Sequence, residues 1–401
     1  MTVTAALHQY RQRLHDRVLS ELAESAARVP GVAARLDGVE LSDLAALDAV
    51  PVLAKDAVPA LQRESPPFGG LLAPDVPVVR MFASPGPIYE VQLVGTDPWN
   101  WAPALRSCGI GPGDVVLNCF SYHLSPAGVM FDEGCRAVGA TVVPGGVGAA
   151  EVQVQVIADL GVTAYIGLPS YLASLVERYD GQGLDPGRWQ LAKALVTAEP
   201  LPDALRARLR ERVPTVLMAY GTAEAGLLGY ETTPGDGLAV STDVYVQLCD
   251  PETGRSVPDD ATGEVVVTVL RPDYPLLRFG TGDVSRWTVG PDGDLRLAGV
   301  LGRSGAAVKV RGMFVHPHQV REVVDGLVAA GGVTAARFVV DRPDDRDVLR
   351  CELLLTDDAE AAQVLDRVTR QVKEGLRVTP VVTSVDVLDD DQVLVDARTW
   401  S

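Results

Sequence analysis

Tyr220 to Glu224 is the part of the chain best equipped for chemistry, because it places an aromatic ring, a hydroxyl and a carboxylate side by side. The run reads Tyr-Gly-Thr-Ala-Glu and follows residues 215–219, an apolar segment typical of a buried strand. Such a run after a buried strand is a signature of nucleotide handling. Two further segments accompany this run as parts of the same signature: residues 278–283, Arg-Phe-Gly-Thr-Gly-Asp, and the pair Gly302-Arg303. The sequence therefore indicates a site for a nucleotide or a nucleotide-like group.

Alternating strands and helices must position these residues. The hydrophobic pattern predicts buried strands at 114–120, 140–144, 164–167, 194–197 and 215–219, and helices at 127–138, 151–160, 170–179 and 202–212. This alternation favours a mostly parallel sheet that is covered on both faces. Further helices are expected at 10–28 and, as a short segment, from 51 to 56.

The pattern changes along the second half of the chain. Residues 238–287 read as strands without intervening helices, and a mixture of short strands and helices follows residue 302. We therefore expect an α/β fold with a large N-terminal domain, 1–302, and a small α+β C-terminal lid domain, 303–401.

Composition excludes several classes of protein. The 401 residues carry a net charge of −18, which would repel a nucleic-acid backbone. No run of about 18 apolar residues could cross a membrane, and the amphipathic N-terminus lacks the pattern of a leader peptide, so we expect a cytoplasmic protein. The five cysteines form no C-x-x-C pair, so neither a metal site nor a disulfide framework is expected, and each cysteine is interpreted as a small buried side chain.

Ten short motifs carry a resemblance over nearly the whole chain. In order, they lie at 51–56, 67–69, 113–116, 139–144, 168–171, 198–200, 220–224, 263–264, 281–283 and 301–312 with Pro317. With these motifs the chain resembles phenylacetate–CoA ligases and their relatives in the adenylate-forming superfamily. The resemblance implies the two-domain fold expected above, and an enzyme of the acid–thiol ligase type that uses an AMP moiety or CoA.

The resemblance also implies roles for the residues of the first motif. Tyr220 and Gly221 would lie at the adenine, Thr222 would touch the α-phosphate, and Glu224 would help hold a magnesium ion. Asp283 would accept hydrogen bonds from both ribose hydroxyls, a task suited to the two oxygens of a carboxylate. Arg303 would lie near the ribose or the phosphate at the domain junction.

Other residues are candidates for the acyl end and for the lid. The resemblance places the acyl pocket at Phe120, Tyr122 and His123, and His123 could act there as a general base or polarise a carbonyl. Glu199 follows a buried strand, a position where α/β sheets carry functional groups, and is a second catalytic candidate together with Glu224. On the lid, Lys309, Arg311 and Gly312 are candidates for contacting CoA; packed or solvent-exposed structural roles stay open for all of these residues.

The phosphate-binding loop departs from the family pattern. Relatives carry a run of serine, glycine and threonine followed by lysine and proline, whereas residues 84–91 here read Ser-Pro-Gly-Pro-Ile-Tyr-Glu-Val. Pro85 and Pro87 lack backbone N–H donors, and Glu90 puts an anion where a cation is expected to face polyphosphate. The sequence thus argues against ATP and magnesium as ligands.

The C-terminal tail departs as well. The family's catalytic lysine precedes a short tail that corresponds here to residues 394–398, but no lysine follows Lys373, and residues 389–391 are three aspartates. These two departures favour an enzyme that transfers, condenses or hydrolyses a pre-activated acyl or aryl group, supplied as a thioester or adenylate, with adenylation lost or impaired.

Two alternatives stay open. One is a genuine ATP-dependent aryl- or acyl-CoA ligase, and the other is a non-catalytic partner of an acyl carrier or of a sister enzyme. The expected partners are a small acyl or aryl substrate and either a CoA thioester or a carrier protein, while the choice between monomer and homodimer stays open.

Overall fold

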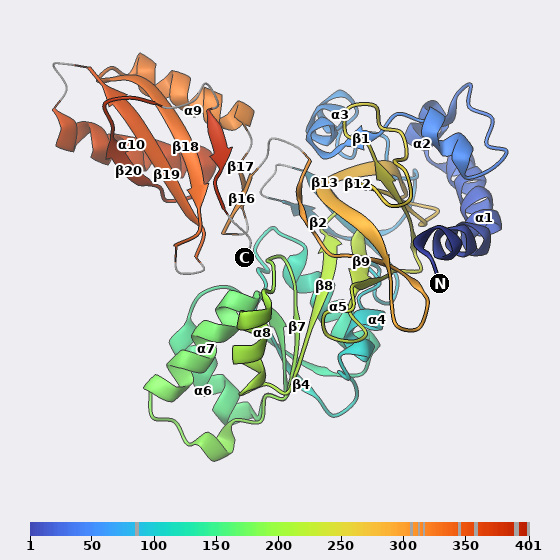
Figure 1. The fold of residues 1–401 in the computed structure, drawn as a ribbon, viewed down its shortest axis with the longest axis horizontal. Coiled ribbons are helices and arrows are strands. Elements are labelled where there is room, and N and C mark those ends of the chain that lie inside the picture. Colours follow the sequence, from blue (N-terminus) through green and yellow to red (C-terminus); the bar gives the residue numbers. More distant parts are fainter. Residues whose placement is uncertain are drawn as a thin grey trace. The chain divides into compact units, whose positions relative to one another are not determined.

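Parallel strands form the first half of the main sheet in the computed structural model of the protein (Figure 1). The structure describes residues 1–84, 88–304, 308–311, 313–315, 317–343, 346–356, 360–388 and 393–398. Five neighbouring strands lie in the order β8-β7-β6-β4-β5 and are parallel. Their bounds are β4 Val115–Asn118, β5 Thr141–Pro144, β6 Ala164–Gly167, β7 Lys193–Val196 and β8 Thr215–Thr222.

Helices cover both faces of these parallel strands, because successive strand residues point to opposite sides. On β4, for example, Val116 packs with helices α4 (Ala102–Ser107) and α5 (Ala127–Ala137), whereas Leu117 packs with the helices of the other face. The helices of that other face are α6 Ala150–Leu160, α7 Pro169–Gly181 and α8 Asp203–Arg210. A short 3-10 turn, η3 Pro186–Arg188, lies between α7 and β7.

Antiparallel strands extend the sheet from β8. The order continues β9-β10-β14-β13-β12-β11, with the short strands β1 and β15 pairing to β13. The bounds are β1 Leu53–Ala54, β9 Gly226–Tyr230, β10 Leu238–Val240, β11 Val244–Cys249, β12 Thr262–Val269, β13 Leu276–Val289, β14 Leu295–Leu297 and β15 Gly302–Arg303.

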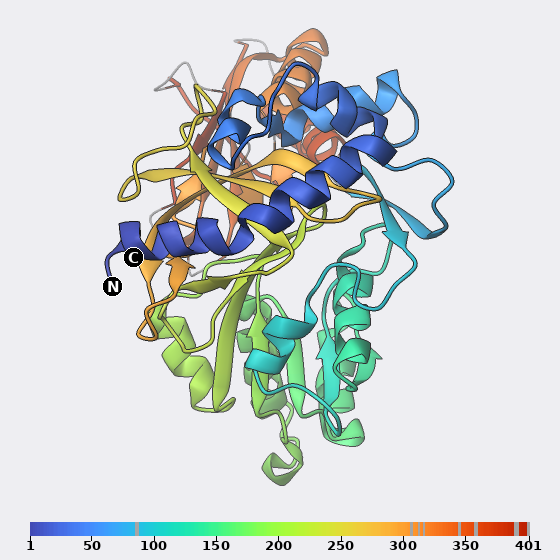
Figure 2. The ribbon, with the colours of Figure 1, turned by 90° about the vertical axis from the view of Figure 1, so that its right-hand side faces the viewer.

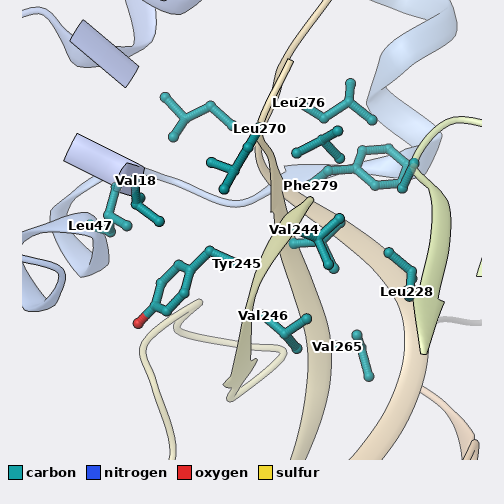
Figure 3. Close-up of a cluster of buried hydrophobic side chains, with 14 of the residues drawn as sticks. Val18, Leu47, Leu228, Val244, Tyr245, Val246, Val265, Leu270, Leu276 and Phe279 are labelled. Atoms are coloured by element: carbon teal, nitrogen blue, oxygen red, sulfur yellow. The ribbon is translucent and has the colours of Figure 1, made fainter. Parts of the chain in front are cut away.

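The N-terminal helix α1 (Val3–Arg28) lies across this antiparallel part, as Figure 2 shows. Tyr10 stacks on Tyr245 with ring centroids 6.0 Å apart, and its hydroxyl oxygen accepts the N–H of Val246. Figure 3 shows the buried cluster that forms around these strands, including Val18 of α1 and Phe279 of β13. The segment after α1 contains α2 Pro30–Leu36, η1 Ala45–Ala49, η2 Lys55–Ala57, α3 Val58–Glu64 and the hairpin β2 Val78–Ala83 with β3 Tyr89–Leu93.

The chain divides into two compact units, Met1–Ser304 and Gly305–Ser401. The second unit has its own core and its own sheet, in the order β20-β19-β18-β21. Its helix α10 buries Val364, Val368, Val372 and Leu376, a spacing of four residues that forms one apolar face. The bounds are β16 Val308–Val310, β17 Met313–Val315, α9 Pro317–Ala329, β18 Val333–Asp341, β19 Val348–Leu355, α10 Ala361–Leu376, β20 Val381–Ser384 and β21 Leu394–Asp396.

The α/β fold class with a separate small C-terminal sheet is confirmed, while several local predictions were wrong. Helix α1 begins at Val3, not at residue 10, and the segment 51–56 starts as strand β1 because it pairs in parallel with β13. The cysteines are buried and free of disulfides, as expected. Within the described chain, no helix is both long and apolar enough to span a membrane.

Candidate nucleotide and acyl site

Tyr220, Asp283 and Arg303 form one hydrogen-bonded group at the centre of the main sheet. Tyr220 lies on β8 and donates its hydroxyl to Asp283 Oδ2 at 2.8 Å. Arg303 Nη1 lies 2.6 Å from Asp283 Oδ1, and the pairing of β13 with β15 sets these two residues opposite each other. The Asp283 side chain is buried, and each of its two carboxylate oxygens has a partner. Burial, followed by the charge of Asp283, raises the pKa of Tyr220 well above its ordinary value, so the phenol stays protonated and can donate.

The backbone at Gly221 and Thr222 is held tightly. Strand β8 runs through Thr222 and turns antiparallel into β9, so the Tyr-Gly-Thr run belongs to the strand and does not follow it. A Cβ added to Gly221 would lie 2.5 Å from the carbonyl oxygen of Gly226 and 2.8 Å from the ring of Trp101, so only glycine fits there. Thr222 Oγ1 accepts the N–H of Ala225 at 3.1 Å, which closes the turn before β9.

Glu224 lies in a buried ion pair with Lys55, which was not among the predicted site residues. Lys55 Nζ is 2.7 Å from Glu224 Oε1. Burial raises the pKa of Glu224, but the charge and hydrogen bond of Lys55 outweigh it, and the net pKa is lowered. The only sequence signal for Lys55 was its place in the motif at 51–56.

Glu90, which the sequence was expected to place near polyphosphate, is buried in the structure. Its side chain is only 1% exposed on β3, and neither carboxyl oxygen has a hydrogen-bond partner in the described part of the structure. Burial first, and then the charge of Glu224, raise the pKa of Glu90 well above the ordinary value of 4.5, while Lys55 opposes the shift. The protonated, neutral form of the Glu90 carboxyl group is therefore favoured more than in an exposed glutamate.

A magnesium ion at this position would compete with the ammonium of Lys55 for Glu224. Across the described ranges, no group of three or more His, Cys, Asp or Glu side chains is arranged to hold a metal ion. The prolines of the loop and the three aspartates before the tail lie outside the described residues.

The three residues of the predicted acyl pocket differ in their surroundings. Phe120 stacks on Phe131 with ring centroids 4.7 Å apart, and Tyr122 accepts a hydrogen bond from Asn118 Nδ2 at 2.9 Å. His123 is exposed, and its ring makes no hydrogen bond within the described residues, so nothing in the structure orients it as a base. The structure thus places Phe120 and Tyr122 against the protein, while His123 faces solvent.

Glu199 is positioned by a neighbouring helix. It follows strand β7, and its Oε2 accepts the hydroxyl of Ser170, in the first turn of α7, at 2.6 Å. The side chain is half-buried, unlike a surface-loop carboxylate. This partner was not anticipated from the sequence, since the two residues come from successive βα units.

The lid candidates lie in the second unit. Lys309 is on β16, and its carbonyl oxygen accepts Arg398 Nη1 at 2.7 Å. Arg311 is exposed after the strand, and its Nε donates to the carbonyl of Asp347 at 2.8 Å. Gly312 lies outside the described residues.

Comparison with known proteins shows which enzymes the chain is similar to. The sequence model of the AMP-binding enzymes matches residues 100–269. A phenylacetate–coenzyme A ligase of Pseudomonas putida is 28% identical over 402 residues, which cover 94% of this chain and 91% of the relative. A phenylacetate–coenzyme A ligase of Thermus thermophilus is 29% identical over 80% of each chain. Over most of its length the chain is thus similar to the phenylacetate–CoA ligases, and its residues 100–269 match the AMP-binding enzymes.

Solved structures support the same fold. A 2-hydroxyisobutyryl-CoA ligase, solved with 2-hydroxyisobutyryl-AMP and CoA in its thioesterification state, superposes with a TM-score of 0.80 at 24% identity, covering 96% of this chain and 90% of that one. The resemblance to phenylacetate–CoA ligases and the expectation of an enzyme with an acid–thiol ligase fold are confirmed. The comparisons give no support to the preferred hypothesis that adenylation is lost, and they favour the alternative of a genuine ligase.

Proposed function

We propose that this enzyme joins a small acyl or aryl carboxylic acid to CoA, by way of an acyl adenylate made from ATP. The observation that carries the proposal is the buried group of Tyr220, Asp283 and Arg303. A carboxylate that is 7% exposed and held by a phenol and a guanidinium is costly to bury, and such a group is retained where a polar ligand uses it. The two hydroxyls of a ribose match the two oxygens of Asp283.

The structure also weakens the main argument against ATP. Glu90 is buried on β3, so its carboxyl group is not an exposed charge facing phosphate, and burial raises its pKa and favours the uncharged form, which does not repel phosphate. The names of the relatives support an acid and CoA as substrates, since this chain covers 91% of the Pseudomonas putida ligase. An acyl adenylate and CoA are both bound in the structural neighbour.

The test is a product assay with the full chain. The enzyme is incubated with ATP, magnesium, CoA and a panel of arylacetic, benzoic and short branched acids, and both AMP and the acyl-CoA mass are measured. We expect equal amounts of AMP and thioester with at least one acid, at about 1–10 turnovers per second. Absence of AMP with every acid, from an enzyme that binds AMP, would refute the proposal.

A second candidate function is thioester formation from an adenylate that another enzyme supplies. The observation in its favour is the Lys55–Glu224 ion pair, which engages the carboxylate that the resemblance assigns to magnesium. The same enzyme is given a synthetic acyl adenylate and CoA without ATP. Thioester formation in this reaction, combined with no AMP release from ATP and free acid, would favour the second candidate.

A further inference from the structure

Ser170 and Glu199 meet at the carboxyl edge of the parallel strands. Strands β6 and β7 are parallel neighbours, and Gly167 pairs with Val196 at their ends. Ser170 lies three positions after the end of β6, in the first turn of α7, and Glu199 lies three positions after the end of β7, so both residues are at the same edge of the sheet. The hydroxyl-to-carboxylate distance of 2.6 Å is that of a strong, charge-assisted hydrogen bond.

The residue before Glu199, Ala198, has an unfavourable backbone conformation that sets the position of Glu199. Ala198 has a φ of +70°, a left-handed conformation that a residue with a side chain rarely adopts. The N–H of Thr197 bonds to the carbonyl of Gly167 at 3.2 Å, which continues the ladder past the end of β7. Ala198 thus lies between a hydrogen-bonded strand end and the partly buried Ser170–Glu199 hydrogen bond, and strained residues of this kind cluster at functional sites.

The carboxylate of Glu199 has acceptor capacity to spare. A carboxylate can accept about four hydrogen bonds, and only the one from Ser170 is made within the described residues. No lysine or arginine pairs with Glu199 in that part of the chain, whereas the half-buried Glu352, for example, is paired with Arg337. A half-buried carboxylate with a fixed orientation and free lone pairs is suited to accept a hydrogen bond from a ligand.

The order of the strands places this pair between the two ends of the candidate site. Strand β7 lies next to β8, which carries Tyr220 and Thr222, and β6 lies next to β4, which leads to Phe120 and Tyr122. An acid whose carboxyl group lay at Thr222 would extend across the ends of β7 and β6. A substituent on its acyl or aryl part would then meet Ser170 and Glu199.

We propose that Ser170 and Glu199 determine substrate specificity by selecting an acid that carries a hydrogen-bond donor, a hydroxyl or an amino group, on its acyl or aryl part. This inference rests on the proposed function, because it takes the carboxylic acid to be the substrate. It assigns Glu199 to recognition of the substrate and not to proton transfer. Ser170 orients the carboxylate and leaves its other acceptor positions for the ligand.

Matched acids test the specificity. The wild-type enzyme is assayed with phenylacetate and with its 4-hydroxy and 4-amino derivatives, and with the corresponding benzoates. The variants are Glu199→Gln, Glu199→Ala and Ser170→Ala, with Glu177→Gln as the control, an exposed glutamate on the same helix α7. The ratio of kcat/KM for the donor-bearing acid to that for the unsubstituted acid is the quantity compared.

We expect this ratio to be about 10 to 100 in the wild type, the range of one hydrogen bond to a charged group. It should fall toward one in Glu199→Ala through a rise in KM, fall less in Ser170→Ala, and stay high in Glu177→Gln. A ratio near one in the wild type, or an equal loss of kcat for all acids in Glu199→Ala, would overturn the inference.

A binding measurement separates this inference from the proposed function. The thermal shift caused by each free acid is measured in the wild type and in the correctly folded Glu199→Gln variant, because a ligand of the native state raises its stability. If no acid yields AMP, the proposed function fails. The specificity role would still be supported if the donor-bearing acid caused a larger thermal shift than the unsubstituted acid in the wild type, and if this difference disappeared in Glu199→Gln. Equal shifts from all acids in both proteins would contradict that role.

Discussion

Lys55 Nζ lies 2.7 Å from Glu224 Oε1, and the two side chains are only 15% and 4% exposed. Removal of one partner from such a buried pair leaves an uncompensated charge, which is far more destabilising than loss of an exposed pair. Lys55→Ala is therefore expected to lower the free energy of unfolding by about 3 kcal/mol. Urea denaturation followed by circular dichroism measures this change. Arg370→Ala breaks the exposed pair with Asp366 and serves as the control, which should leave stability unchanged within error.

Glu90 should make stability fall as pH rises. Its folded pKa is raised well above 4.5, mainly by burial and then by Glu224, so the folded state keeps a proton that the unfolded chain releases. The stability that this proton contributes is fully present below about pH 4.5 and is lost as pH rises through the folded pKa. The slope is at most about 1.4 kcal/mol per pH unit. Glu90→Gln holds a neutral side chain at every pH, so its stability relative to the wild type should grow across this range; parallel pH profiles would contradict the buried, neutral Glu90.

Asp283 should govern nucleotide affinity. Asp283→Asn keeps the shape of the side chain but removes the charge that faces Arg303 and accepts from Tyr220. We expect AMP to bind about tenfold more weakly, as for loss of one hydrogen bond to a charged group. Isothermal titration calorimetry measures the affinity, and Asp294→Asn, in an exposed turn of the same region, is the matched control. An unchanged affinity in Asp283→Asn would remove Asp283 from the nucleotide site.

Gly221 should tolerate no side chain. The added Cβ of Gly221→Ala would meet the carbonyl of Gly226 at 2.5 Å, and both strands are fixed by their ladder. We expect a loss of about 1–3 kcal/mol, typical of overpacking. Gly181→Ala, at the end of α7, meets no atom within 4 Å and should stabilise the helix slightly. Thermal melts of the two variants should move in opposite directions, and equal shifts would refute the steric argument.

The sequence predicted the parallel strands well because each is a short apolar run between helices. Strand β6, 164–167, agrees residue by residue with the expectation, since all four of its residues are buried and the apolar run has clear ends. The strand β21, Leu394–Asp396, was not predicted as a separate strand, because it is three residues long and depends on its pairing with β18.

The candidate site could be predicted in its residues but not in its partners. Tyr220, Asp283 and Arg303 were named from motifs, and the structure brings them together. The pairing of Glu224 with Lys55, and the burial of Glu90, depend on how β1 and the β2–β3 hairpin fold back onto the main sheet. Motif spacing contains no information on such long-range contacts, so the burial of Glu90 could not be predicted from it.

Strand β13 makes the nucleotide site inseparable from the whole of the first unit. It pairs with β1 near residue 53, with β12, with β14 and with β15 near residue 303, and it carries Asp283 in its middle. The region 100–269, which the sequence model of the AMP-binding enzymes matches, contains Tyr220 but ends before β13 begins. An excised fragment with these limits would keep the region that matches the family but would lack Asp283, the hydrogen-bond partner of Tyr220.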